Sequence, residues 1–140
     1  MRRRSFLLLP AGLPALAALQ KGSPLRRAVV SLYTTDEDKD WDTNVSIRIG
    51  RGKETVARKE NIQGLFNNYS TQSIDLEVAF PVEREELERS GTLTIQISPN
   101  GHDTWRFDAT VRLDFGGPTL ERSHRGITLD QDRREYRTSL

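Results

Sequence analysis

The eleven residues from Trp105 to Phe115, WRFDATVRLDF, carry the most regular pattern in this chain of 140 residues. Apolar side chains occupy every second position, and arginine, aspartate or threonine occupies each position between them. Because successive side chains of a β-strand point to opposite faces, this alternation predicts a long strand with one buried and one solvated face.

The same alternation recurs elsewhere in the chain, with turn-forming residues between the repeats. It is clearest from Val45 to Ile49, from Ile74 to Phe80 and from Leu93 to Ile97. Weaker strand patterns cover residues 126–130 and 134–138, the second at a sheet edge. Turn residues cluster at 50–53, 64–70, 98–103 and 116–118. This series predicts an all-β fold, an antiparallel β-sandwich.

One helix is predicted, over the segment PVEREELERSG from Pro81 to Gly91. Proline opens this segment, acidic residues follow, Arg89 lies near its end and glycine closes it, as helix termini favour. The segment is long enough only for a crossover between sheets. We therefore expect a single β-sandwich domain over residues 28–140, with at most one short helix.

The first 17 residues have the parts of a signal peptide. A basic head, MRRRS, precedes the apolar run FLLLPAGLPALA, and Ala15-Leu16-Ala17 suits a cleavage site. We predict a signal peptide over 1–17, a leader over 18–27 and export to the periplasm or the cell exterior. The head segment Arg3-Arg4-Ser5-Phe6-Leu7 resembles the twin-arginine (Tat) motif, although a general secretory signal also accommodates three arginines.

Composition narrows the expected partners. Removal of three of the 21 basic residues with the signal would leave 18 against 20 acidic residues, which makes nucleic acid an unfavourable ligand. The chain has no cysteine, so its fold is free of disulfides. We expect a monomer that binds a lipid surface, a protein or a glycan.

The segment TTDEDKDWDT, from Thr34 to Thr43, is the most acidic in the chain. Its aspartates recur at every second position, and hard Ca²⁺ requires several oxygen ligands at once. One hypothesis is a calcium site in which Asp103 joins from another loop; the other is a solvated acidic turn. In the first hypothesis the calcium ligands are Asp36, Asp38, Asp40, Asp42 and Asp103. No other cofactor is predicted.

Three residues are candidates for a binding surface. Trp41 either lies at a loop tip, where indole favours a lipid interface, or folds back onto the core. Trp41 and Tyr69 together would suit a carbohydrate-stacking platform. His102 beside Asp103 would be needed for a small secreted hydrolase, but no nucleophile motif accompanies this pair, so we expect no enzyme and no catalytic residues.

Three segments together resemble the PLAT (lipoxygenase-homology) domain: AVVSLYTTDEDKD, DTNVSIRIG and SPNGHDTWRFDATVRLDF. In that family an acidic loop follows the first strand, an Asp-Thr pair leads into the second, and a late strand carries tryptophan. The glycine-rich loop usual after the first strand is replaced here by DEDKDW. The resemblance implies a noncatalytic sandwich that binds membranes or proteins, often with calcium at its loop ends.

Overall fold

The computed structural model describes residues 23–140. The predicted signal peptide, 1–17, and the first half of the predicted leader, 18–22, lie outside these residues. The folded region begins earlier than the expected Ala28, because Pro24 forms a β-bridge with Glu83 and Leu25 is only 4 % exposed. The end of the leader is therefore part of the packed domain.

Residues 23–140 form eight strands and one helix, and every strand pairing is antiparallel. The sheet order is β7-β6-β1-β4-β3-β2-β5-β8. In chain order the elements are β1 (Arg27–Glu37), β2 (Asn44–Arg51), β3 (Glu54–Ile62), β4 (Thr71–Val78), α2 (Arg84–Ser90), β5 (Gly91–Ser98), β6 (Trp105–Asp114), β7 (Leu120–Leu129) and β8 (Glu135–Ser139). None of the described helical residues makes a helix long and apolar enough to cross a membrane.

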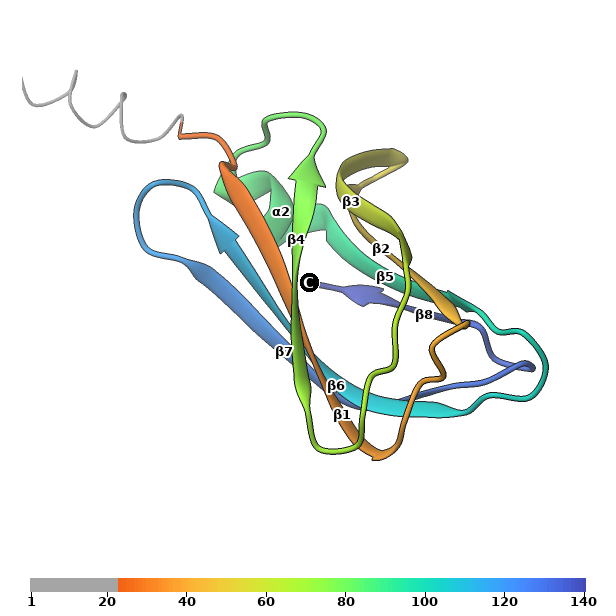
Figure 1. Cartoon of the computed structure of the whole chain (residues 1–140). Coiled ribbons are helices and arrows are strands. Elements are labelled where there is room, and N and C mark those ends of the chain that lie inside the picture. Colours follow the sequence, from red (N-terminus) through yellow and green to blue (C-terminus); the bar gives the residue numbers. More distant parts are fainter. Residues whose placement is uncertain (1–22) are drawn as a thin grey trace, which may run out of the picture.

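The eight strands belong to one strongly curved sheet (Figure 1). Its two edge strands approach each other where the rings of His124 in β7 and Tyr136 in β8 lie 6.1 Å apart. The predicted all-β antiparallel fold is confirmed, but the sheet is nearly closed and barrel-like instead of forming a clear sandwich. The alternation of apolar and polar residues could not distinguish a barrel from a sandwich, because both architectures give each strand one buried face.

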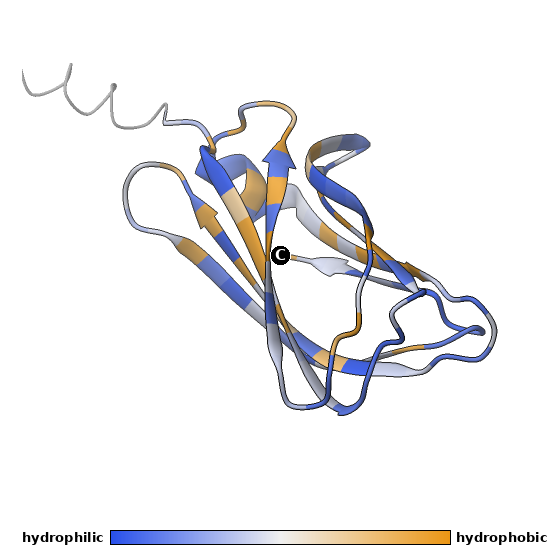
Figure 2. Cartoon of the chain, in the orientation of Figure 1, coloured by the Kyte–Doolittle hydropathy of each residue, from blue (hydrophilic) through white to orange (hydrophobic). Residues whose placement is uncertain are grey.

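The side chains that alternate along the strands form the core. Hydrophobic and hydrophilic positions follow one another along β1, β2, β5 and β6 (Figure 2). In β6, Trp105 and Phe107 are fully buried and stack with their centroids 3.7 Å apart. The buried face predicted for residues 105–115 is therefore confirmed.

Several elements differ from the sequence prediction, among them β3 and α2. Strand β3 was not predicted, because Arg58, Lys59, Glu60 and Asn61 are all exposed and show no alternation. Helix α2 starts at Arg84, after an extended Glu83, so Pro81 does not open it. Leu87 is buried and fastens this helix to the core.

Candidate functional site

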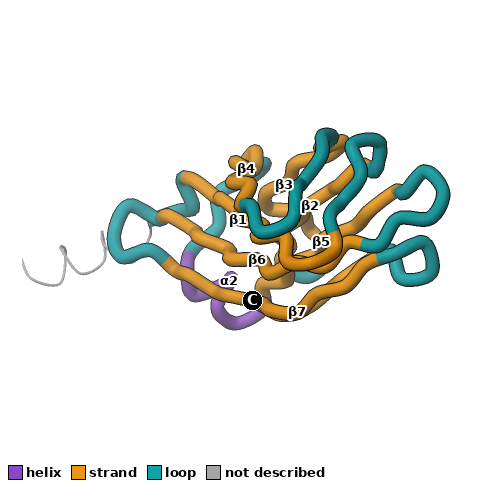
Figure 3. Tube along the Cα trace, turned by 60° about the horizontal axis from the view of Figure 1, so that its bottom comes forward, coloured by secondary structure: helices purple, strands orange, loops and turns teal. Residues whose placement is uncertain are grey.

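Loops from four parts of the chain meet at the end of the molecule away from α2 (Figure 3). Lys39, in the β1–β2 loop, forms a β-bridge with Phe66 in the β3–β4 loop. Asn100, in the β5–β6 loop, donates to Asp42 over 3.1 Å, and His102 contacts Gln131 of the β7–β8 loop at 2.9 Å. The acidic segment thus lies among loops that contact one another.

Lys39 is the most unexpected residue of this end, because it is fully buried inside the acidic loop. Its Nζ donates to the carbonyl oxygens of Asp40 and Thr43, each at 2.8 Å, and to that of Gly64. The same nitrogen lies 4.4 Å from the centroid of the Phe66 ring, within cation–π range. The ammonium group has three donors, and three backbone carbonyls accept from it.

The charge of Lys39 is subject to opposing effects. Burial lowers the pKa of Lys39, while the nearby carboxylates of Asp103, Asp40 and Asp42 raise it. Three hydrogen bonds to carbonyl dipoles also favour the charged form. Sequence reasoning missed this residue, because a lysine among acids is typical of a solvated turn. The only available signal was that it is the single basic residue between Thr34 and Thr43.

Asp103 joins the β5–β6 loop to the acidic loop, as the sequence predicted for two loops at one end. It is 6 % exposed, and its Oδ2 accepts from Thr43 Oγ1 at 2.6 Å and from the backbone N–H of Asp40 at 3.1 Å. Both bonds fix the backbone around Lys39. Asp103 therefore holds the loop by hydrogen bonding.

The other acidic residues take separate partners. Both oxygens of Asp36 accept from Arg106 at 2.8 Å, and this bond lowers the pKa of Asp36. Asp42 accepts from Asn100, while Asp38 is exposed. Desolvation, followed by repulsion from Asp103, Asp38 and Asp42, raises the pKa of Asp40. The carboxylates of the acidic loop therefore do not converge on one point; they belong to Asp36, Asp38, Asp40 and Asp42.

A calcium site requires several oxygens that converge on one point. Within residues 23–140, no three histidine, cysteine, aspartate or glutamate side chains are grouped so that they could hold a metal. The predicted ligand set therefore does not fit a calcium ion in this arrangement. Calcium binding at the acidic loop stays a prediction.

The exposed large apolar side chains of the described chain all lie on β1 and on the two loops that Lys39 joins. Trp41 is 70 % exposed and Tyr69 68 %, so the alternative in which Trp41 folds onto the core does not hold. Leu65 and Tyr33 are 49 % and 38 % exposed. We call these four side chains, Tyr33, Trp41, Leu65 and Tyr69, the loop face.

Tyr69 is held outward by a costly backbone conformation. Its φ of 60° lies in the left-handed region, which is unfavourable for an aromatic residue. The backbone N–H of Tyr69 donates to the carbonyl of Thr34 at 2.8 Å, which fixes this conformation. Phe66, by contrast, is buried and packs edge-on against Trp105 with centroids 5.6 Å apart.

His102 does not form the acid–base pair that a hydrolase would use. Its ring is exposed, and its Nδ1 contacts Gln131. The carboxylate of the neighbouring Asp103 is directed at Thr43 and the Asp40 backbone instead. Sequence adjacency therefore does not translate into a catalytic contact.

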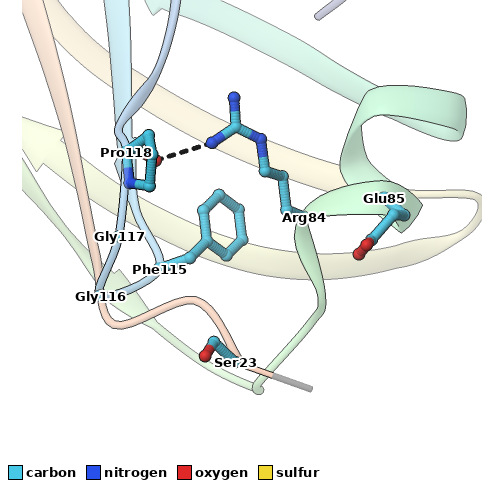
Figure 4. A pocket seen from close by; sticks show the side chains of 7 residues that line it. All are labelled: Ser23, Arg84, Glu85, Phe115, Gly116, Gly117 and Pro118. Atoms are coloured by element: carbon cyan, nitrogen blue, oxygen red, sulfur yellow. Dashed lines mark hydrogen bonds between the residues drawn. The ribbon is translucent and has the colours of Figure 1, made fainter. Parts of the chain in front are cut away.

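A pocket of about 460 Å³ lies at a different place, beside α2 and the turn between β6 and β7 (Figure 4). Arg84 reaches across it and donates to the carbonyl of Pro118 at 2.7 Å. None of the residues predicted to bind a ligand lines this pocket. Its lining residues are Ser23, Arg84, Glu85, Phe115, Gly116, Gly117 and Pro118.

No model of a known protein family matches the chain, and comparison with characterised proteins finds no match either. A function must therefore be inferred from the residues themselves. The loop face and the contacts beneath it are the arrangement from which we infer one.

Proposed function

We propose that this chain is an exported, noncatalytic binding module of PLAT-like type that holds a protein partner through the loop face. The observation that carries the proposal is the location of the exposed apolar side chains: Tyr33, Trp41, Leu65 and Tyr69 share β1 and two loops that are hydrogen-bonded to each other. Scattered apolar residues need no explanation, but a set confined to one end of a molecule favours an interaction site.

The rigidity beneath these side chains supports recognition. The backbone N–H of Gly64 donates to the carbonyl of Trp41 at 3.2 Å, so the backbones that carry Trp41 and Leu65 are neighbours. Lys39 fastens the same two loops to each other, and Asp103 fastens the first of them to the β5–β6 loop. A preorganised surface loses less entropy when it binds, which favours affinity.

A protein suits this surface better than a membrane does. Tryptophan and tyrosine are enriched among the residues that dominate the energetics of protein interfaces, and the rim of such interfaces is polar and solvent-accessible. The acids Asp38, Asp40 and Asp42 would repel the negative surface of anionic lipid. Lipid binding is consequently the weaker alternative.

A glycan is the second candidate, and one observation favours it. Asn67 and Asn68 are exposed beside Tyr69, and the indole of Trp41 is on the adjoining loop. Exposed aromatic rings next to amide donors and acceptors can stack on a sugar and hydrogen-bond to its hydroxyls. Glycan binding would use Trp41 and Tyr69 but would gain little from Leu65.

Site-specific photo-crosslinking tests the proposal on the full exported chain. A benzophenone amino acid at position 65 lies on the loop face, and the same group at position 53 provides a matched control at the exposed β2–β3 turn. We expect one defined protein adduct from position 65 in intact cells and none from position 53. The adduct would be identified by mass spectrometry and the protein purified.

Affinity for that purified protein then decides the role of the loop face. Trp41→Ala or Tyr69→Ala should weaken binding at least about tenfold, as for aromatic anchors, whereas Lys53→Ala should not change it. Equal adducts from both positions would contradict the proposal. Binding of glycan arrays or vesicles, with no protein adduct, would instead identify one of the alternative ligands.

A further inference from the structure

Lys39 lies where an acidic loop would otherwise need a metal. The loop brings backbone carbonyls together at one point, with carboxylates nearby, and clustered oxygens of this kind favour a cation. Here the ammonium of Lys39 is in the middle, fully buried, with Asp103, Asp40 and Asp42 close enough to influence its charge. The positive charge is part of the chain itself.

We propose that the three carbonyl oxygens of Asp40, Thr43 and Gly64, with the ring of Phe66, form an ammonium site that the Lys39 side chain fills, so that the loop face assembles without metal. We call this arrangement the ammonium cage. Its lysine is a positioning residue for the proposed binding surface, because it orders the loops and does not itself reach a partner.

The cage links two segments far apart in the sequence. Asp40 and Thr43 belong to the β1–β2 loop, and Gly64 belongs to the β3–β4 loop. Trp41 lies between the first two acceptors, and Gly64 also bonds to Trp41 through its N–H. Removing the ammonium would leave the carbonyls of Thr43 and Gly64 without this donor, while that of Asp40 keeps the N–H of Thr43, and would loosen Trp41 together with Leu65.

The geometry favours an ammonium group over an oxygen-ligated metal. Three N–H groups match three acceptors, and an aromatic ring attracts an ammonium but is not a calcium ligand. One oxygen of the Asp103 carboxylate, Oδ2, already accepts from Thr43 Oγ1 and from the Asp40 N–H. The cage thus has few oxygens left for a second cation.

Chemical rescue tests the cage directly. Lys39→Ala removes three carbons and the ammonium group, and n-propylammonium supplies those same atoms. We expect the variant to melt roughly 10 °C below the unsubstituted protein, since two carbonyls lose this donor. Added n-propylammonium should raise the melting temperature of this variant in a concentration-dependent way, because it binds only the folded cage.

Matched controls separate the cage from general solvent effects. 1-Propanol has the same chain without the charge, and tetramethylammonium has the charge without N–H donors; neither should rescue Lys39→Ala. Lys53→Ala, at an exposed turn, should neither lose stability nor respond to n-propylammonium. Equal rescue by all three compounds, or none by n-propylammonium, would overturn the proposal.

Two measurements on the unsubstituted protein apply even if Lys39→Ala does not fold. Lysine-selective ¹H–¹⁵N NMR at neutral pH should show one ammonium signal protected from solvent exchange, because only a buried, hydrogen-bonded ammonium exchanges slowly. Millimolar calcium or a chelator should leave the melting temperature unchanged. An unprotected Lys39 amine, or a calcium-dependent rise in melting temperature, would contradict the ammonium cage.

This inference rests on the proposed function only where it concerns the loop face, and the two can fail separately. Lys39→Met keeps an apolar side chain in the cage but removes the donors. We expect the Trp41 indole N–H signal to shift and broaden in Lys39→Met, and to change more than that of Trp105, which contacts the cage only through the ring of Phe66. An unchanged Trp41 signal would remove the positioning role, whatever the photo-crosslinking experiment finds.

Discussion

Single carboxylates in the acidic loop have opposite effects on stability. The pKa of Asp40 is raised by desolvation and by neighbouring carboxylates, so the folded state disfavours its charge at neutral pH. Asp40→Asn should therefore stabilise the protein, by about 0.3 to 0.5 kcal/mol because solvent screens an exposed group. Chemical denaturation at pH 7 measures this change.

Asp36 provides the control in the same loop. Its pKa is lowered by Arg106, so the folded state favours its charge, and Asp36→Asn should reduce the free energy of unfolding. The stabilising effect of Asp40→Asn should also vanish as the pH falls and Asp40 takes up a proton in the folded state. Destabilisation by both changes would mean that Asp40 has a favourable partner.

At the level of residues, the sequence revealed the participants of the candidate site better than their roles. Aspartates at every second position indicated the acidic loop, and Asp103 was correctly expected to lie near it. Side-chain direction was not predictable: Trp41 points outward although large aromatic residues are usually buried, and Lys39 is buried although lysine is usually exposed. Both residues bond to Gly64 of a distant loop, Lys39 through the Gly64 carbonyl and Trp41 through the Gly64 N–H, and local patterns do not reveal such contacts.

Strand β5 offers a test of the sheet register. Ile95 is fully buried, so Ile95→Asp should cost roughly 4 kcal/mol, because the carboxylate has no partner in the core. Thr94 faces the other side, yet it is only 5 % exposed, contrary to the solvated face expected there. Arg48 and Arg137 lie directly opposite Thr94 on the two neighbouring strands. Their long side chains account for the low solvent exposure of Thr94.

The two arginines give Thr94 a preference for one sign of charge. Thr94→Asp should cost about 1 kcal/mol or less, because both neighbours are cationic, whereas Thr94→Lys should be at least about 1 kcal/mol less stable than Thr94→Asp. Denaturant midpoints of the two variants measure the difference. If the two variants were equally stable, Arg48 and Arg137 would not be the neighbours of Thr94.

At the level of elements, the alternation of apolar and polar residues predicted the strands that have one buried face. It failed to predict strands whose residues are exposed on both faces. Strands β2, β5 and β6 alternate apolar and polar residues along most of their length and were predicted. Strand β3 pairs with β4 only at Ala57 and Arg58, and its exposed second half, 58–61, lacks an apolar period. Most of β7 was missed for the same reason, since residues 121–126 are largely exposed at the sheet edge.

The shape of the whole molecule depends on how closely β7 approaches β8. No backbone pairing joins these two strands, so side chains must close the sheet. His124 and Tyr136 meet there at 66° between ring planes, and the Nε2 atom of His124 is buried without a hydrogen-bond partner. A neutral imidazole tolerates this position better than a charged one does.

Acidification should therefore weaken the closure of the sheet. Burial lowers the pKa of His124 below its ordinary value of 6.5, so the unfolded chain binds a proton at a higher pH than the folded chain. Stability from this group is complete above pH 6.5 and is lost as the pH falls toward the lowered pKa of the folded state.

Unfolding free energies from pH 7.5 down to pH 5 should decline less in His124→Gln, whose side chain stays neutral. His102 is the only other histidine and is exposed, so His102→Gln should decline as the unsubstituted protein does. If His124→Gln followed the same decline, protonation at the β7–β8 contact would not be its cause, and the carboxylates of the loops would have to account for it.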